Sequence, residues 1–290
     1  MSGSITLENR FGVNKMELIS LKYAIFVIVL LVLYYCFPKK YRWYVLLAGS
    51  MAYYVIICKW YVLFIIFTIC TTYGSTIWID KLLKKQNAIV KSHKEDWDRQ
   101  TRKDYKEKGR KKRVAVMLFA LLCNFGILAF LKYIPYAGEL GLLLPLGISF
   151  YTFQSMGYVM DVYREIVEPE KNFLKVALFV SFFPQIIQGP IAIYDKLAGQ
   201  LYEGHSLRLE NLQKGALLVL WGVMKKLVIA DRAVNIINFV MDKPMDFSGT
   251  YVFFAAVVYA LQLYADFSGG IDIVRGIAEM FGITMSTNFN

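Results

Sequence analysis

Apolar residues in this sequence gather into long uncharged stretches that recur along most of the chain. A helix needs about 20 predominantly apolar residues to cross a bilayer, with a range of roughly 17–25. Seven stretches reach or approach that length, and Lys22 and Lys59 beside the two shortest can extend toward the membrane surface. The seven stretches are Tyr23–Pro38, Trp43–Cys58, Trp60–Ile79, Val114–Leu131, Leu140–Met160, Val176–Tyr194 and Phe247–Ala265.

An eighth stretch, Gly215–Ala230, is weaker because Lys225 and Lys226 interrupt it. A buried helix of a soluble protein would show polar residues at a period of 3.6, whereas these segments are apolar all round. The pattern therefore predicts an all-α, polytopic transmembrane protein, with a single membrane domain over residues 1–290.

The composition agrees with a membrane protein. Hydrophobic residues make up 57% and charged residues 19% of the chain, whereas soluble domains carry roughly 25% charged residues. An aromatic content of 16% excludes a disordered chain. The four cysteines lie in apolar segments and show no metal-ligand spacing, so we expect neither a disulfide scaffold nor a metal site.

Positive charge is concentrated in one connection between apolar segments. The chain has a net charge of +11, and residues 80–113 hold 14 Lys or Arg against 6 Asp or Glu. Lys and Arg in short connections mark the cytoplasmic side, which predicts a basic cytoplasmic loop at 80–113 and no nucleic-acid partner. The connection with Lys39, Lys40 and Arg42 is then cytoplasmic too, and the amino terminus lies outside. We expect the first apolar run to be retained, because no small-residue cleavage site follows it.

Proline, glycine and polar residues enter the apolar stretches in the second half of the chain. Leu144–Gln154 carries a proline and an amide, and Phe182–Ile191 carries two prolines, a glycine and two glutamines. Proline inside a helix costs about 3 kcal/mol or more and frees a carbonyl group. In lipid such groups must be buried in protein or line a wet cavity. Phe183–Ile191 is therefore a candidate broken or re-entrant helix, with a packing kink as the alternative.

Carboxylates and arginines recur three residues apart, in Asp161 with Arg164 and in Asp272 with Arg275. Residues at that spacing share a helix face, so each pair can neutralise itself. Asp266 follows directly after the last apolar stretch. Charged groups at membrane depth usually face an interior path, but an ion pair that fixes a helix end explains them as well.

Motifs of soluble enzymes are missing from the sequence. It contains no nucleophile elbow, P-loop, dinucleotide fingerprint or histidine-rich metal motif. The two histidines, His93 and His205, lie in polar segments and are expected to be solvated loop residues. We expect no tightly bound cofactor.

Several motifs in one order resemble the membrane-bound O-acyltransferase family. The nearest branch is the bacterial alginate O-acetyltransferase type, and the D-alanyl transferase of teichoic acids is a near relative. The motifs are Pro145–Gln154, Asp161–Arg164, Phe182–Ile191, Lys225–Arg232, Tyr264–Gly270, Gly276, Met280–Gly282 and Asn288–Asn290.

The resemblance implies a multi-helix enzyme of the bacterial plasma membrane with a tunnel through the bilayer. Members pass an acyl group, here expected to be acetyl, from a cytoplasmic activated donor such as acetyl-CoA to a hydroxyl of an exported polysaccharide or cell-wall polymer. They often work with an extracytoplasmic acyltransferase partner, and membrane lipid surrounds them.

The family's histidines set one limit on this inference. In the family a Trp-His stretch follows soon after Asn-Phe-Asn and a second histidine lies further on, whereas this chain ends at Asn290. Neither His93 nor His205 matches those positions. We therefore expect an amino-terminal fragment without a catalytic residue of its own.

Two other classes of function stay open, a non-catalytic membrane subunit and a transporter-like protein with broken helices. For the acyltransferase we expect a tunnel wall that binds substrate. Its candidate residues are Gln154, Pro184, Gln188, Gly189, Pro190, Asp266 and Ser268.

Overall fold

Helices make up the secondary structure of the computed structural model, which describes residues 18–93, 95–133 and 144–287. No strand occurs in these residues, so the predicted all-α class is confirmed. The elements are α1 (Leu21–Cys36), η2 (Lys39–Tyr41), α2 (Arg42–Cys58), η3 (Lys59–Tyr61), α3 (Val62–Ser92), α4 (Arg99–Tyr133), α6 (Ile148–Tyr163), α7 (Phe173–Ser181), α8 (Phe183–Gln188), α9 (Tyr194–Tyr202), α10 (Leu209–Met224), the π-helical η4 (Lys225–Ala230), α11 (Asp231–Met241), η5 (Pro244–Asp246) and α12 (Gly249–Met280).

Three helical stretches are long and apolar enough to cross a membrane, namely Lys39–Ser92, Arg99–Tyr133 and Gly249–Met280. Leu21–Cys36 and Phe173–Gln188 are shorter apolar stretches. Large apolar side chains on these helices are exposed, among them Leu122 and Phe253. Apolar helices with apolar outer faces are what a bilayer requires, so the chain is a membrane protein.

The chain divides into two compact units. Among the described residues, the first unit holds 47–182 and 193–199, and the second holds 18–46, 183–192 and 200–287. Each is described by itself below. The expected single membrane domain over residues 1–290 stays a prediction.

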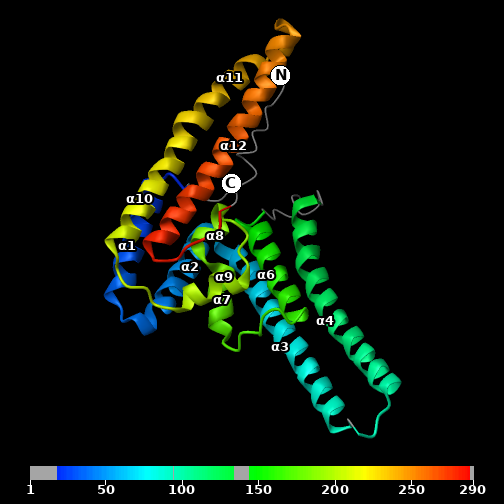
Figure 1. Ribbon diagram of the computed structural model, residues 1–290. Coiled ribbons are helices and arrows are strands. Elements are labelled where there is room, and N and C mark those ends of the chain that lie inside the picture. The colour runs from blue at the N-terminus through cyan, green and yellow to red at the C-terminus, as the bar shows by residue number, and fades with distance from the viewer. Residues whose placement is uncertain (1–17, 94, 134–143, 288–290) are drawn as a thin grey trace. The chain divides into compact units, whose positions relative to one another are not determined.

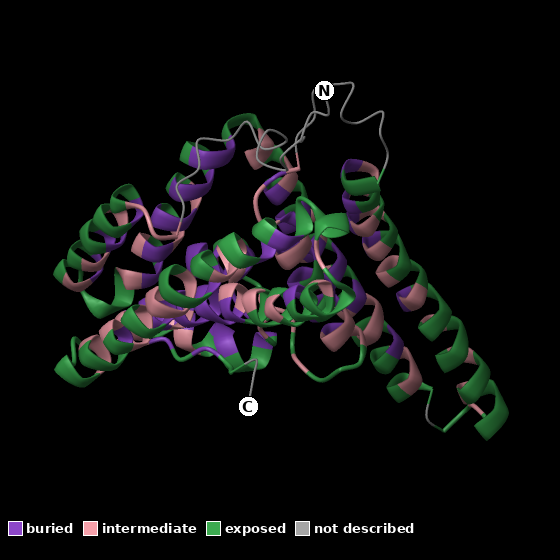
Figure 2. Ribbon diagram, turned by 90° about the horizontal axis from the view of Figure 1, so that it is seen from above, coloured by how far each residue is buried: buried purple, intermediate pink, exposed green. Residues whose placement is uncertain are grey.

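A long hairpin of α3 and α4 dominates the first unit, with α6 packed against both helices (Figure 1). Most of the basic connection over residues 80–113, which was predicted as a loop, is helical, because α3 continues to Ser92 and α4 begins at Arg99. Lys, Arg, Glu and Gln are good helix formers, and the ion pair of Lys84 with Asp80 supports this extension at i,i+4. Figure 2 shows that the hairpin tip is largely exposed.

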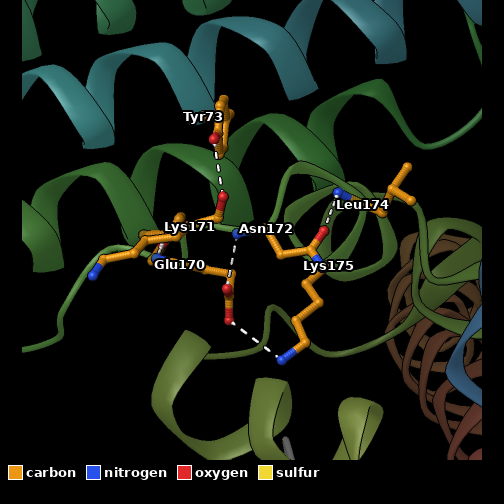
Figure 3. A network of polar contacts seen from close by, with 7 residues as sticks. Tyr73, Glu170, Lys171, Asn172, Leu174 and Lys175 are labelled. Carbon is orange, nitrogen blue, oxygen red and sulfur yellow. Dashed lines mark hydrogen bonds and ion pairs between the residues drawn. The ribbon is translucent and has the colours of Figure 1, made fainter. Parts of the chain in front are cut away.

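A polar network fixes the start of α7 in the same unit (Figure 3). Asn172 is the N-cap, and its side chain accepts a hydrogen bond from the Leu174 N–H at 2.9 Å. The Glu170 carboxylate in turn accepts from the Asn172 N–H at 2.9 Å. Tyr73 of α3 donates to the Lys171 carbonyl at 3.0 Å. Such a cap satisfies backbone donors that a helix start leaves unpaired.

In the second unit α10, η4 and α11 run alongside α12 as an antiparallel partner (Figure 1). Two pairs of glycines let the backbones touch, because a Cβ on Gly215 would lie 2.5 Å from the Gly276 carbonyl oxygen and one on Gly269 would lie 2.8 Å from that of Gly222. The glycines are seven residues apart on each helix, and small residues at such a seam are the usual means of close helix packing in membranes.

The carboxyl end of α12 is anchored to α1. The Tyr35 hydroxyl donates to the Met280 carbonyl at 2.7 Å, and the ring of Phe281 packs edge-on against Tyr34 with 5.3 Å between centroids. Gly282 then turns the chain with φ +81°, a left-handed conformation that glycine adopts without a steric penalty. The end of α12 is thereby held in place.

The predicted break in the helix over Phe183–Ile191 is present. Helix α7 ends at Ser181, α8 covers six residues from Phe183, and the chain is not helical from Gly189 to Ile193. Pro184 is the second residue of α8, where its missing N–H costs no helical hydrogen bond.

Candidate functional site

A cluster of paired charges lies between η4 and α12 in the second unit. Lys225 Nζ is 2.7 Å from Asp272 Oδ2, and Lys226 Nζ hydrogen-bonds Asp266 Oδ1. Arg275 Nη1 is 3.4 Å from Asp272 Oδ1, so the pairing expected from the i,i+3 spacing is confirmed. We call these five residues the lysine–aspartate cluster.

The local backbone explains why two neighbouring lysines both reach α12. Residues one apart on an α-helix point about 100° apart, but Lys225 and Lys226 begin a π-helical turn, which locally rewinds the helix. Such turns are frequent at functional sites. Gly269 leaves room for the lysine stems, since a Cβ there would lie 3.1 Å from Lys225 Cβ and 3.0 Å from Lys226 Cγ.

The cluster is partly buried. The side chain of Asp272 is 12% exposed and that of Lys225 is 16% exposed, whereas that of Asp266 is 39% exposed. Removing one partner from a buried pair costs about 3–5 kcal/mol, because the other charge is left uncompensated. Each carboxylate of the cluster is thus paired with at least one cation, and the more open end of the cluster is at Asp266.

Gln188 of α8 lies next to the cluster. Gly270 of α12 has no room for a side chain, because an added Cβ would collide with the amide of Gln188. Gly270 is four residues after Asp266, so the two positions share one face of α12. The structure thus brings Gln188 and Asp266, both predicted from the sequence, to one side of this helix.

The residues around Gln188 shape a tight turn. Gln185 donates from Nε2 to the Pro190 carbonyl at 3.0 Å, and the Gly189 N–H donates to the Gln185 carbonyl at 3.0 Å. A Cβ on Gly189 would lie 2.6 Å from Gln185 Cα, so only glycine fits. Pro184 is buried in the first turn of α8. Pro184, Gly189 and Pro190 therefore set the backbone that presents Gln188.

Ser268 does not join the cluster. Its side chain is buried, and its Oγ has no hydrogen-bond partner within the described residues. It lies two residues after Asp266, and residues at that spacing do not face each other on a helix.

Gln154 belongs to the first unit and has a structural partner there. Its Nε2 donates to the Phe179 carbonyl at 2.8 Å, and its side chain is buried. The last four carbonyls of a helix lack an intrahelical donor, and Phe179 lies in the last turn of α7. Gln154 therefore closes the end of α7.

Asp161 and Arg164 form no ion pair within 4 Å among the described side chains. Arg164 is exposed after the last turn of α6. The expected pair is therefore not an ion pair at contact distance, because α6 ends at Tyr163 and Arg164 is its C-cap.

The histidines do not supply a catalytic imidazole to the cluster. His205 is half-buried rather than solvated, which corrects the expectation, because its Nε2–H donates to the Gln200 carbonyl at 2.8 Å and its backbone N–H donates to the Tyr34 hydroxyl at 3.2 Å. His93 is exposed and stacks on Trp97 with 4.8 Å between ring centroids. No group of three metal-ligating side chains gathers in the described residues.

Sequence reasoning missed Lys225, Lys226 and Gln185 as site residues. The signal for the lysines was present, since two positive charges in an apolar stretch need partners. Their partners could not be assigned, because Asp272 and Asp266 are 47 and 40 residues away along the chain.

Comparison with known proteins identifies relatives, although no protein-family model matches the chain. The peptidoglycan O-acetyltransferase of Helicobacter pylori is 32% identical over 212 residues, which cover 60% of this chain and 40% of that protein. The probable alginate O-acetylase AlgI of Pseudomonas syringae is 36% identical over 149 residues, 51% of this chain and 28% of that protein.

A more distant relative is the teichoic acid D-alanyltransferase of Bacillus subtilis, which is 25% identical over 151 residues. The match covers 50% of this chain and 37% of that protein. The chain thus spans less than half the length of these relatives. Their names confirm the resemblance that the sequence motifs indicated.

Proposed function

We propose, from the premise that this chain is related to bacterial O-acetyltransferases, that it forms part of a membrane acyltransferase. The enzyme would move an acetyl group from an activated donor such as acetyl-CoA, on the cytoplasmic side, to a hydroxyl of an exported polysaccharide or cell-wall polymer. This chain would then lie in the bacterial plasma membrane with its amino terminus outside and its basic hairpin tip in the cytoplasm.

One observation carries the proposal, the lysine–aspartate cluster on α12 with Gln188 beside it. A helix that only anchors a protein in lipid has no use for five ionised groups among apolar neighbours, because each is costly there. A path for a polar acyl group or acceptor hydroxyl needs polar walls. The Gln188 amide and the more exposed Asp266 carboxylate are suited to bind such groups.

The role of the chain's residues in the reaction is binding and orientation. In O-acetyl transfer the acceptor hydroxyl loses its proton to a base, its oxygen bonds to the acetyl carbon, and the bond from that carbon to the donor's sulfur or oxygen breaks. The base is not assigned to a described residue, because neither imidazole lies in the cluster. Positioning of a bound group can still supply much of the rate.

The proposal is tested by joining residues 1–290 to the carboxyl-terminal part of the Helicobacter pylori relative. Membranes with this fusion would be supplied with radiolabelled acetyl-CoA, a second activated acetyl donor, and peptidoglycan or alginate acceptors. We expect label in ester linkage to one of the polymers. An inserted, folded fusion that labels no polymer hydroxyl from either donor would contradict the acyltransferase.

A non-catalytic membrane subunit is the second candidate, and the position of the histidines favours it. The His205 ring nitrogen Nε2 is hydrogen-bonded to the Gln200 carbonyl, and His93 is exposed on the hairpin of α3 and α4. Such a subunit would co-purify with a separate acyltransferase, and that enzyme would lose activity when residues 1–290 are deleted. An enzyme that is fully active without them would contradict this candidate.

A further inference from the structure

A cavity of about 440 Å³ lies in the first unit, between the extensions of α3 and α4 beyond their apolar stretches. Helix α3 contributes Gln86, α4 contributes most of the wall, and Glu165 follows from the end of α6. The volume falls in the range of roughly 300–1,000 Å³ that is typical of small-molecule sites. The cluster on α12 plays no part in it.

The wall on α4 is a stripe of cations. Lys103, Lys106, Arg110 and Arg113 all line the cavity, and their spacing of three, four and three residues places them on one side of the helix. Lys103, Lys106 and Arg110 form no ion pair in the part of the chain that the structure describes. Four cations and two carboxylates, Glu107 and Glu165, line the cavity, so its wall carries a net positive charge.

Glu107, the carboxylate of α4 that lines the cavity, has its ion-pair partner outside the lining. Glu107 Oε1 is 3.1 Å from Lys111 Nζ. The hydrogen bond from Lys111, followed by the charges of Lys111, Arg110 and Lys103, lowers the pKa of Glu107 below its ordinary value. The surroundings of Glu107 are thus positive, and its own charge is balanced by a lysine that does not line the cavity.

Buried polar groups form the floor of the cavity. Arg113 is only 8% exposed, and its Nε–H has no partner among the described residues. Gln86 is 6% exposed and donates to the Lys106 carbonyl at 3.3 Å, while its Oε1 lacks a partner in the same part of the chain. Buried polar groups normally have a partner, and the unpaired Arg113 donor adds to the positive charge of the lining, which favours an anionic ligand.

Glu165 holds Arg113 in place at the cost of an unfavourable backbone. Its Oε1 accepts from Arg113 Nη1 at 2.8 Å, while its own φ is +62°. Left-handed residues other than glycine are uncommon and are often found at functional sites. Two hydrogen bonds, Ile166 N–H to the Asp161 carbonyl and Glu165 N–H to the Val162 carbonyl, stabilise this turn at the end of α6.

The depth of the cavity suits a phosphate group. The apolar stretches end at Ile79 and begin again at Val114. Gln86 is seven residues beyond the first, or about 10 Å at a rise of 1.5 Å per residue. The polar layers add about 10–15 Å in total to a hydrocarbon core of about 30 Å, or about 5–7 Å on each side. The cavity therefore starts at the inner edge of the headgroup layer, where Arg113 directly precedes Val114, and reaches just past that layer at Gln86. Lipid phosphates lie at this level, and soluble phosphates reach it from water.

We propose that this cavity binds the phosphate group of an anionic ligand through Lys103, Lys106, Arg110 and Arg113. Two sources share this chemistry, the headgroup of an anionic lipid and a soluble phosphate compound. The proposal does not depend on the acyltransferase function.

The test compares two double variants of the full chain in detergent. Lys106→Gln with Arg110→Gln removes two charges from the cavity, and Lys108→Gln with Lys112→Gln removes two exposed charges of α4 that do not line it. Native mass spectrometry would count retained phosphatidylglycerol, and equilibrium dialysis would measure bound ³²P-pyrophosphate. Circular dichroism would check that both variants stay helical.

We expect the cavity variant to lose binding at least fivefold in one of the two arms, and the control variant to change less than twofold. Loss in the lipid arm identifies a headgroup, and loss in the pyrophosphate arm identifies a soluble phosphate. Equal losses of binding in the cavity variant and the control variant would show an effect of general surface charge and would overturn the proposal. Binding by the cavity variant that is unchanged in both the lipid arm and the pyrophosphate arm would overturn it as well. If the cavity variant is not helical, Lys103→Gln, at an exposed position, is measured instead under the same criteria.

Discussion

The lysine–aspartate cluster of the second unit and the cationic stripe of the first unit differ in how their charges are paired. In the second unit each lysine of η4 meets a carboxylate of α12, and Asp272 serves Lys225 and Arg275 together. In the first unit only Arg113 of the cationic stripe is paired, through Glu165, while Lys103 and Lys106 are left without a carboxylate among the described residues. Charge within apolar helices must be neutralised locally, whereas charge beside the membrane is free to meet a ligand.

The largest expected effect comes from breaking the paired region. Asp272→Asn keeps the shape of the side chain but leaves Lys225 and Arg275 without their common partner. We expect the free energy of unfolding to fall by about 3–5 kcal/mol, measured by denaturant unfolding in detergent. Asp246→Asn, at an exposed position of η5, is the matched control. Equal stability of the two variants would show that the cluster is not a stabilising network.

The glycine seam gives the next effect. Gly222→Ala would place a methyl group against the Gly269 carbonyl and push α10 away from α12. We expect a loss of about 1–3 kcal/mol from overpacking, seen as a lower midpoint of unfolding. Gly74→Ala in α3 meets no atom within 4 Å, and a helical alanine there should stabilise by up to about 1 kcal/mol. Similar changes in both variants would contradict close packing at the seam.

The turn at α8 is tested by activity. Gln188→Leu or Pro184→Ala, in the fusion with the relative's carboxyl-terminal part, should lower acetyl transfer about tenfold, or about 1.4 kcal/mol in the barrier. The amount of folded protein should not change. Gln213→Leu, on the exposed side of α10, is the control. Equal losses of folded protein and activity would make these residues structural.

The smallest effect concerns the start of α4 on the hairpin tip. Hydrogen bonds from Thr101, from its hydroxyl first and then its backbone N–H, hold the pKa of Asp98 below the ordinary value of 3.8. A lowered folded pKa stabilises the helix start above the unfolded pKa, and this stabilisation is lost as the pH falls through the folded value. Carboxyl NMR titration should give a midpoint below 3.8 in the folded protein. The control is the Thr101→Ala variant, in which Asp98 loses the hydroxyl partner. An Asp98 midpoint at the ordinary value, or one that is the same in both proteins, would contradict the cap.

Much of the fold was predictable, because every predicted apolar stretch contains at least one helix in the described residues. The break at Phe183–Ile191 was predictable as well, since Pro184 and Pro190 forbid a continuous helix. The extension of α3 and α4 into residues 80–113 was not predictable, because a charged connection between two apolar stretches indicates a loop, whereas its i,i+4 pairs and good helix formers favour a helix.

The candidate site was predictable only in part. Local composition indicated Gln188 and Asp266, because polar residues in an apolar stretch stand out. The partners Lys225 and Lys226 depended on how two distant helices pack, which the glycines determine and which no spacing in the sequence reveals. Gln154 stood out for the same reason as Gln188, yet its amide closes a helix end.

The central claim is that the lysine–aspartate cluster serves acyl transfer and does more than hold two helices together. The most direct measurement is the acetyl-transfer rate of the fusion carrying Lys226→Gln and Asp266→Asn together, which removes both charges of one pair and leaves neither partner uncompensated. The account predicts at least a tenfold lower rate at an unchanged level of folded protein. An unchanged rate would contradict the claim and leave the cluster a structural feature of the membrane helices.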